Sequence, residues 1–522
     1  MAVSTTVVIA VTAVYIVIML VLGYIGYKKT RNTEDYLVAG RNAHPVVIAL
    51  SYGATFISTS AIVGFGGQAA NLGMGLIWLT VLNIGVGILI AFVVFGKKTR
   101  EIGQRLKAIT FPDLMGKIYH SQFMQVLTGV IILIGMPLYT AAVLIGGAQF
   151  IKETLGISYG ISSIDFALIV AIYVIFGGLI AVMYTDAVQG AIMLVGMTIL
   201  LVATYLILGG VTVANTALTN MADLVPAKLA EQGMNGWTVM PDLGSPIWYT
   251  VITTLVLGVG IGVLAQPQLV VRFLTAKDSR SLNRAVLVGG PFILMMTGVA
   301  FTVGALTNMY FYQTQGKIAV QVATGGNIDT IIPIFINSAI PEWFVVIFMV
   351  TLLAAAMSTL SSLFHAMGTA LICDVWGRGR ECALSLRANQ GGVLLMIVAS
   401  VIIAFLMPGS IIAIATAMFM GLCASAFLPV FAVAVYCKKP DPLAAKASLV
   451  VGALVWFIWA LFVNTKYAAV FGLSKTLFGQ VGILGYPWSA IDPIVIALPL
   501  SAITILTLQY MRGGCAGVAQ VA

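Results

Sequence analysis

The sequence predicts an all-α polytopic membrane protein with about 13 transmembrane helices. Three observations support this fold class. Hydrophobic residues make up 60% of the 522 residues and charged residues only 8%, a composition unlike that of soluble domains. The apolar residues form long runs that are separated by polar or basic loops. Glycine and hydroxyl residues interrupt some of these runs, and such interruptions are tolerated at membrane depth only where they line a site.

The apolar runs predict the spans and the orientation of the first helix. Residues 5–27 are apolar, lack a preceding basic residue and are followed by Lys28 and Lys29, which favours an uncleaved first helix with its N-terminus outside. Further spans are expected near 46–71, 75–96, 122–151, 164–183, 186–208, 247–271, 285–312, 332–373, 391–407, 411–436, 447–463 and 491–511.

The basic residues agree with this topology. The outer loops contain Lys152, Lys228, Lys317, Lys466 and Lys475. The other 21 of the 26 basic residues, with Arg272 among them, then fall on the cytoplasmic side. We therefore expect a multi-pass protein of the plasma (cytoplasmic) membrane with a cytoplasmic C-terminus. The net charge of +9 is attributed to cytoplasmic loops and not to nucleic-acid binding.

Two interrupted spans predict an internal repeat. The span near 46–71 is rich in hydroxyl and glycine residues, and the span from 247 contains Gly258, Gly260 and Gly262. Each opens a block of five spans, which indicates a 5+5 inverted repeat led by discontinuous helices. The alternative is a chance spacing of glycines, which are common in membrane helices. The predicted organisation is an N-terminal helix with a basic loop at 1–44, repeats at 45–208 and 247–437, and two C-terminal helices at 447–512.

Four hydroxyl residues lie close together in the apolar segment 332–373. At about 100° per residue, Ala355, Ser358 and Thr359 share one sector of a helix, and Ser358, Ser361 and Ser362 share an overlapping one. Hydroxyl oxygens suit a small alkali cation, so the two clusters can hold one or two Na⁺. Alternatively, these small residues serve helix packing while each hydroxyl bonds to a carbonyl of the preceding turn.

Asp186 is the acidic residue of greatest interest because a carboxylate at membrane depth is costly and usually functional. It opens the span 186–208 and is able to cap that helix together with Thr185 and Gln189. It is equally able to supply the negative charge of a cation site near Ser361 and Ser362. The sequence leaves these two interpretations open.

Four segments resemble the sodium:solute symporter family, in particular its proline and pantothenate branch. They are GAQFIKETLGISY (147–159), FGGLIAVMYTDAVQ (176–189), AQPQLVVRFLTAKDSRSLNRA (265–285) and AAAMSTLSS (354–362). The resemblance covers about residues 5–440. It implies a leucine-transporter-type fold with one helix before the ten-helix core and two after it.

The resemblance also implies two sodium sites. The family's main site corresponds here to carbonyls of Ala54, Ile57 and Ala355 and to the hydroxyls of Ser358 and Thr359. A second site found in some members corresponds to Asp186, Ser361 and Ser362. These positions agree with the two overlapping sectors described above.

The substrate positions depart from those of known branches. The aspartate of proline symporters is replaced by Phe56, and their pocket tryptophans and tyrosine fall on Ser60, Val259 and Val263. The acid–glutamine pair of sugar transporters falls on Ser60 and Ala61. The candidate substrate-binding residues are small or neutral: Ser58, Thr59, Ser60, Gln68, Tyr139 and Gly260. Hydroxyl donors and half-helix ends suit a carboxylate, so a monocarboxylate-type organic anion is the expected solute.

We therefore predict a sodium-coupled symporter that imports a small organic solute by alternating access. A sodium-coupled amino-acid (proline-like) or pantothenate symporter and a proton-coupled symporter are the alternatives. A channel or an enzyme is disfavoured because the sequence shows neither a repeated pore motif nor a catalytic constellation. The expected partners are the solute, Na⁺ as the co-transported ion and the lipid bilayer, and no oligomer is required.

Overall fold

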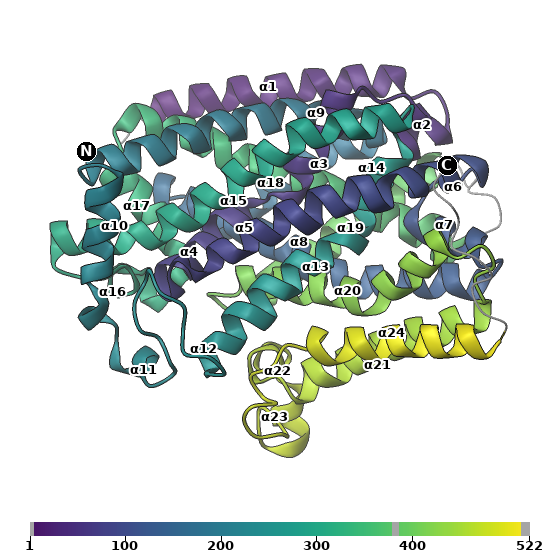
Figure 1. Cartoon of the computed structure of the whole chain (residues 1–522). Helices are drawn as coiled ribbons and strands as arrows, with labels where there is room; N and C mark the ends of the chain where they lie inside the picture. Colours follow the sequence, from purple (N-terminus) through teal and green to yellow (C-terminus); the bar gives the residue numbers. More distant parts are fainter. Residues whose placement is uncertain (1–4, 378–385, 513–522) are drawn as a thin grey trace.

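A computed structural model of the chain describes residues 5–377 and 386–512. The described residues are almost entirely helical, and their only β-type contact is an isolated bridge between Ala43 and Ala276. Long helices run side by side through the molecule (Figure 1). Three short helices lie at one end: α10 (Val211–Asn220), α11 (Ala227–Ala230) and α16 (Ala319–Val322). Three others lie at the opposite end: α2 (Thr33–Val38), α6 (Lys97–Arg105) and α7 (Phe111–Ile118). The loops predicted to be outer and those predicted to be cytoplasmic therefore gather at opposite ends.

Among the described residues, eleven helices are long and apolar enough to cross a membrane, and one bent pair adds a twelfth span. The first and last single helices are α1 (Thr5–Lys29) and α24 (Ile494–Met511). The next span, Met74–Arg105, consists of α5 (Ile77–Ile84), η4 (Gly85–Gly96) and α6. The others between the first and the last are α8 (Gln122–Leu155), α9 (Tyr159–Ile207), Pro246–Leu274, α15 (Ser279–Gln315), Glu342–Trp376 with α18 (Glu342–Thr369), α19 (Leu386–Leu406), α20 (Ile412–Tyr436) and α21 (Pro442–Phe462).

The element α9 contributes two spans. At 49 residues and about 1.5 Å per residue, it is twice as long as a bilayer requires. Gly178 adopts φ 55° and ψ −153°, which interrupts the helix. Ala181 lies against Gly26 near the end of α1, whereas Gln189 bonds at 3.0 Å to Tyr15, eleven residues earlier in α1, so the chain after the break runs back along α1. Counting both arms brings the described spans to 13, in line with the predicted number, although the turn lies at Gly178 and not just before Asp186.

The first interrupted span consists of α3 (Pro45–Phe56) and α4 (Phe65–Leu72), with a short helix of residues 60–64 before α4. The two halves are bent by 49°. The bend follows Ile57, whose backbone is extended at φ −93° and ψ 109°. This segment was expected to be broken because of its glycine and hydroxyl residues. The break exposes backbone groups inside the molecule, where they need partners.

The second interruption lies at a different place from the one predicted. Residues Gly258 to Gly262 are helical, and the break occurs at Gln266, just before Pro267. Proline has no N–H and forces the preceding residue out of the helical region, which explains this position. Gly262 serves close packing instead, because a Cβ there would overlap the carbonyl of Met420 in α20.

The centre of the molecule is α18, which is buried along nearly its whole length against α9, α8 and α3. The helix α1 lies at the periphery beside α9 (Figure 1). Gly23 and Gly26 of α1 contact Tyr173 and Ala181, so small residues allow the two backbones to approach closely. The hydroxyl-rich stretch of α18 therefore lies deep in the protein, next to the bend after α3.

Candidate functional site

The bend between α3 and α4 is held by side chains of its own residues and of α8. The backbone N–H of Ser60 donates to Ser58 Oγ at 3.1 Å, which caps the second half of the broken helix. Tyr139 Oη of α8 donates to the same Ser58 oxygen at 3.4 Å. Thr59 Oγ1 donates to the carbonyl of Val143 at 2.9 Å. The bend is thus a built feature that is anchored to a neighbouring helix.

The hydroxyls of α18 meet the carbonyls at the end of α3. Ser358 Oγ lies 2.9 Å from Ala54 O and 3.2 Å from Ala355 O. Thr359 Oγ1 lies 3.3 Å from Ala54 O and 3.1 Å from Thr55 O. All of these groups are fully buried. The structure therefore brings Ala54, Ala355, Ser358 and Thr359 into one cluster of neutral oxygens.

This oxygen cluster has the chemistry of a small-cation site. Carbonyl and hydroxyl oxygens are the hard neutral ligands that alkali ions accept in place of water. In the structure the hydroxyls donate to the carbonyls. If the hydroxyl protons rotate away, lone pairs of both the hydroxyl and the carbonyl oxygens can coordinate a cation. Ile57 ends α3, and its N–H donates to Gly53 O at 2.9 Å. The Thr55 carbonyl is a member of the cluster that sequence reasoning did not include.

A second cluster surrounds Asp186 on α9. Asp186 Oδ2 accepts from Ser51 Oγ at 2.8 Å and from Thr55 Oγ1 at 3.2 Å, and Oδ1 lies 3.4 Å from Ser361 Oγ. Ser362 Oγ is 2.9 Å from Thr55 Oγ1. The three residues predicted for a second sodium site, Asp186, Ser361 and Ser362, therefore do lie together.

The guanidinium of Arg272 occupies the centre of this second cluster. Arg272 Nη2 lies 3.1 Å from Asp186 Oδ2 and 2.5 Å from Ser362 Oγ, and Nε donates to Ser51 Oγ at 3.0 Å. The side chains of Arg272 and Asp186 are 1% and 0% exposed, so the pair is fully removed from solvent. The arginine supplies the positive charge that the buried carboxylate requires.

The sequence assignment of Arg272 to a cytoplasmic loop is therefore wrong. The residue lies in α14 (Pro267–Leu274), which starts after the break at Gln266 and turns its arginine inward. A positive-inside count cannot distinguish an arginine at the end of a span from one buried in the bundle. The available signal was Asp186 itself, because a carboxylate at membrane depth normally has a cationic partner.

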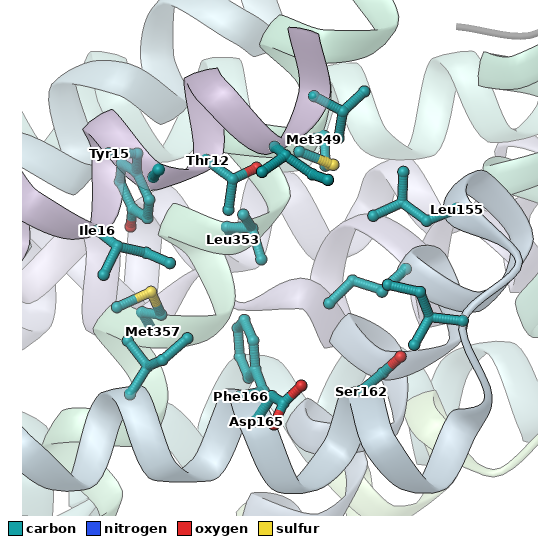
Figure 2. Close-up of a pocket in the computed structure, with 16 residues that line it drawn as sticks. Thr12, Tyr15, Ile16, Leu155, Ser162, Asp165, Phe166, Met349, Leu353 and Met357 are labelled. Carbon is teal, nitrogen blue, oxygen red and sulfur yellow. The ribbon is translucent and has the colours of Figure 1, made fainter. Parts of the chain in front are cut away.

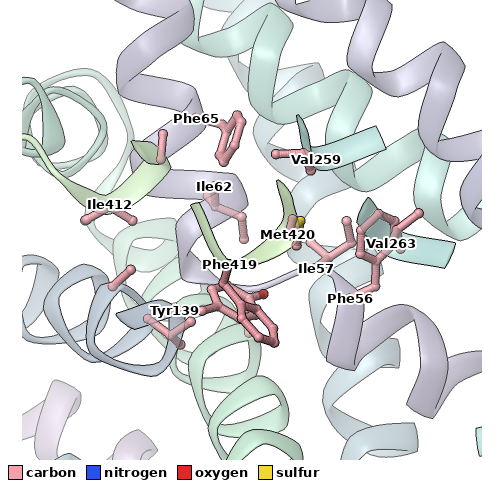
Figure 3. Close-up of a cluster of buried hydrophobic side chains, with 14 of the residues drawn as sticks. Phe56, Ile57, Ile62, Phe65, Tyr139, Val259, Val263, Ile412, Phe419 and Met420 are labelled. Atoms are coloured by element: carbon pink, nitrogen blue, oxygen red, sulfur yellow. The ribbon is translucent and has the colours of Figure 1, made fainter. Parts of the chain in front are cut away.

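A small cavity adjoins the bend and is the candidate substrate site. Its volume is about 20 Å³, close to the space of a single water molecule, so any solute requires the surrounding helices to move apart. The cavity is lined by Phe56, Ile57, Ser58, Ala61, Phe65, Leu79, Asn83, Tyr139, Val259, Thr297, Phe301, Thr416 and Met420. Figure 3 shows the apolar part of this environment, with Tyr139 and Phe419 below the bend and Phe65 above it.

Two of the six predicted substrate residues, Ser58 and Tyr139, line this cavity. Thr59, Ser60, Gln68 and Gly260 are not among its lining residues. Thr59 is directed at α8, and a Cβ on Gly260 would meet Leu82 at 2.8 Å, so these positions serve helix contacts. Asn83 was not predicted.

Asn83 lies inside the apolar span Met74–Arg105 and is buried. Within the described residues its Oδ1 has no hydrogen-bond partner. Asn83 is the only amide in the predicted span 75–96, and this was the signal in the sequence that could have revealed it.

A larger cavity of about 300 Å³ lies away from this site, between α1, α9 and α18 (Figure 2). Its lining is almost wholly apolar, and it includes Met349, Leu353 and Met357 of α18. Ser162 and Asp165 of α9 lie at one side of it. None of the predicted ion or substrate residues lines this cavity.

A broken first core helix, a buried oxygen cluster at its bend and an adjoining central cavity together define a secondary transporter of the leucine-transporter type. The comparison with solved structures agrees with this fold. A Na⁺-coupled sialic acid symporter, solved in its substrate-bound outward-open state, superimposes with a TM-score of 0.72 over 99% of each chain, at 16% sequence identity. This likeness concerns the fold.

The sequence comparisons give the family. The model of the sodium:solute symporter family matches residues 36–463. The chain is 26% identical over 492 residues to sodium/proline symporter 2 of Staphylococcus saprophyticus, covering 89% of both chains. It is 27% identical over 437 residues to the sodium/pantothenate symporter of Haemophilus influenzae, covering 83% of this chain and 85% of the relative.

The chain belongs to the sodium:solute symporter family. It is a multi-pass membrane transporter and not an enzyme, with Na⁺ as its co-transported ion and a small molecule as its substrate. The predicted family, fold class and type of activity are thereby confirmed.

Proposed function

We propose that one Na⁺ binds between α3 and α18, held by the carbonyls of Ala54, Ile57 and Ala355 and the hydroxyls of Ser358 and Thr359. The observation that carries this proposal is the direct contact of Ser358 and Thr359 with Ala54 O, across the bend of the broken helix. Such an ion links α3, the first half of the broken helix, to α18. Its loss to the cytoplasm loosens that link and releases the solute.

The second predicted ion site has a competitor in Arg272. A Na⁺ beside Asp186, Ser361 and Ser362 would have to displace a guanidinium that already donates to Asp186 and Ser362. Two cations sharing one carboxylate repel each other at this depth. We therefore propose coupling to one Na⁺ while the pair of Asp186 and Arg272 is intact, and a second ion only in a state that separates them.

The proposed substrate is a small monocarboxylate-type organic anion. Its support is the neutral lining of the cavity, in which Ser58, Tyr139 and Thr416 offer hydroxyl groups and no carboxylate is present among the lining residues. A carboxylate lining the cavity would repel an anion. The positive end of the half-helix that follows Ser58 adds to the attraction.

A neutral amino acid such as proline, or pantothenate, is the second candidate. The named relatives are proline and pantothenate symporters. The free Oδ1 of Asn83 in the cavity is an acceptor that an ammonium or amide N–H of such a solute would satisfy.

Competition experiments distinguish these candidates. The purified chain is reconstituted in proteoliposomes with an inward Na⁺ gradient, and labelled monocarboxylates, neutral amino acids and pantothenate are tested for uptake. Each active label is then challenged with the other compounds. We expect saturable, Na⁺-dependent uptake of a monocarboxylate that other short acids inhibit. Inhibition by amino acids and not by simple acids would favour the second candidate, and uptake that follows pH but ignores Na⁺ would refute sodium coupling.

Asn83→Leu separates the two candidates further. Removal of the amide should weaken the binding of an amino acid or pantothenate more than that of a simple acid, because only an amino acid or pantothenate offers an N–H to Oδ1. Asn308→Leu is unsuitable as a control because Asn308 already bonds to the carbonyls of Ala70 and Ala305. Thr128→Val is a better one, since Thr128 is a buried polar residue that does not line the cavity.

The plasma membrane is the proposed location, with the N-terminus outside and the C-terminus in the cytoplasm. The support is the biased distribution of basic residues together with the separation of the two sets of loops at opposite ends of the molecule (Figure 1). Labelling of single cysteines introduced at Lys228 and Lys277 with a membrane-impermeant reagent in intact cells tests it. Labelling at Lys277 alone would reverse the orientation.

A further inference from the structure

The largest basic recess among the cavities described here lies at the end of the molecule that carries α6 and α7 (Figure 1). It has a volume of about 640 Å³. Its walls come from α6 (Lys97–Arg105), the end of α7 (Phe111–Ile118) and the segment that follows α20. The basic lining residues are Lys98, Arg105, Lys117, His120, Lys438 and Lys439, and one carboxylate, Glu101, is present.

Much of the positive charge in this recess is not neutralised by protein groups. Lys117 pairs with Asp113 at 2.8 Å, and Lys98 lies 4.0 Å from Glu101. In the described part of the chain no carboxylate lies within ion-pair distance of Arg105, Lys438 or Lys439. Three unpaired cations around one concave space attract an anion and repel each other without one.

Asp441 is the nearest acid along the chain, but it is already engaged. Its Oδ2 accepts from Arg512 Nε at 2.9 Å, and its Oδ1 caps α21 by accepting from the N–H of Ala444 at 2.8 Å. Asp441 therefore leaves the charges of Lys438 and Lys439 available to a ligand.

The surroundings of the recess favour a lipid over a free solute. Tyr436 at the end of α20 donates to the carbonyl of Val94 in η4. Val94 precedes Lys98 by four residues, about one helical turn. Val94 and Val93 are 38% and 46% exposed, and Leu89 further along the span is 49% exposed. An apolar, membrane-facing strip thus leads directly to the basic recess, as required for acyl chains that continue from an anionic headgroup.

We propose that this recess binds the phosphate headgroup of an anionic membrane phospholipid. The phosphate accepts charge-assisted hydrogen bonds from Arg105, Lys438 and Lys439, and the acyl chains lie along η4. Because α6 and α7 belong to the first predicted repeat and α20 to the second, a bound headgroup bridges the two repeats. The proposal is independent of the sodium and substrate sites.

The test uses the purified full chain in detergent, titrated with palmitoyl-oleoyl phosphatidylglycerol or phosphatidylcholine and observed by native mass spectrometry. We expect the anionic lipid to bind more tightly than the zwitterionic one. Each cation removed should weaken binding about fivefold. The triple variant Arg105→Gln, Lys438→Gln, Lys439→Gln should therefore bind phosphatidylglycerol about 100-fold more weakly. Should the triple variant not fold, each single variant should show its own fivefold loss.

The matched control is Lys277→Gln, Arg280→Gln, Arg284→Gln. These three residues are basic, exposed and predicted to lie on the same side, but they do not line the recess. This control should bind phosphatidylglycerol like the parent. An equal loss in both triple variants would show a general charge effect and overturn the site. Displacement of phosphatidylglycerol by equimolar inorganic phosphate would identify a free-phosphate site and overturn the lipid assignment.

Discussion

Removing the hydroxyl of Thr359 tests the proposed ion site most directly. Thr359→Val keeps the shape of the side chain and deletes one oxygen. In the structure that oxygen bonds to the carbonyls of Ala54 and Thr55 at 3.3 and 3.1 Å, an interaction worth about 1 kcal/mol. In the ion-bound state the same oxygen faces a full charge, which is worth about 1.5–3 kcal/mol. Sodium binding should therefore weaken by the difference, about 0.5–2 kcal/mol.

That difference corresponds to an increase of about 2- to 30-fold in the Na⁺ concentration for half-maximal uptake. The assay is initial-rate uptake into proteoliposomes at saturating solute, with choline replacing Na⁺ to keep ionic strength constant. Ser358→Ala should show a similar increase, since Ser358 Oγ contacts Ala54 O and Ala355 O.

Thr369→Val is the matched control for Thr359. Thr369 is also buried on α18, and its hydroxyl bonds to the carbonyl of His365 at 2.8 Å, one turn back. Sodium dependence should not change in this variant. A half-saturating Na⁺ concentration that stays within twofold of the parent in both Thr359→Val and Ser358→Ala would refute the ion site. A change of equal size in Thr369→Val would show that the effect is a packing defect of α18.

Three further predictions concern the buried charges. Arg272→Gln should lower the free energy of unfolding by about 3–5 kcal/mol, because it leaves Asp186 buried and unpaired. Adding Asp186→Asn to the same chain should restore much of this loss. Thermal unfolding in detergent measures both, and a double variant whose loss equals the sum of the two single losses would contradict the prediction. The steepness of the Na⁺ dependence should be unchanged in Asp186→Asn if one ion is coupled, and a lower Hill coefficient would instead support the second site. Burial raises the pKa of Asp329, in the loop before α17 (Ile331–Ala339), to about 7, against an unfolded value near 4. Between about pH 4 and pH 7 the Asp329 carboxyl is therefore protonated in the folded state and ionised in the unfolded state. The stability that this protonation gives the folded state is complete below about pH 4 and is lost as the pH rises through about 7. Melting temperatures in detergent from pH 5 to 8 should fall in the parent but not in Asp329→Asn, and parallel profiles would refute this assignment.

Much of this protein follows from properties that are local in the sequence. Hydrophobic runs of membrane length give the spans, because every backbone polar group in lipid must bond within its own helix. The grouping of the α18 hydroxyls is also local, because helix geometry alone places Ser358 and Thr359 on one sector. The fold class was accessible at this level, whereas the family and the sodium coupling followed from the resemblance of four sequence segments to a known family.

Contacts between distant segments were decided only by the tertiary structure. The pairing of Arg272 with Asp186 joins α14 to α9, and no local pattern reveals that an arginine at the end of a span turns inward. The lining of the central cavity is similar, since Asn83 and Thr416 meet Tyr139 only when their helices pack together. The break at Gln266 is a further example, because Gly262, one of the glycines that suggested a bend, is needed for close packing against α20. Periodicity and hydropathy determine which helices form. Which side chains meet between them depends on how those helices are rotated and placed, and that is set by the packing of the whole bundle.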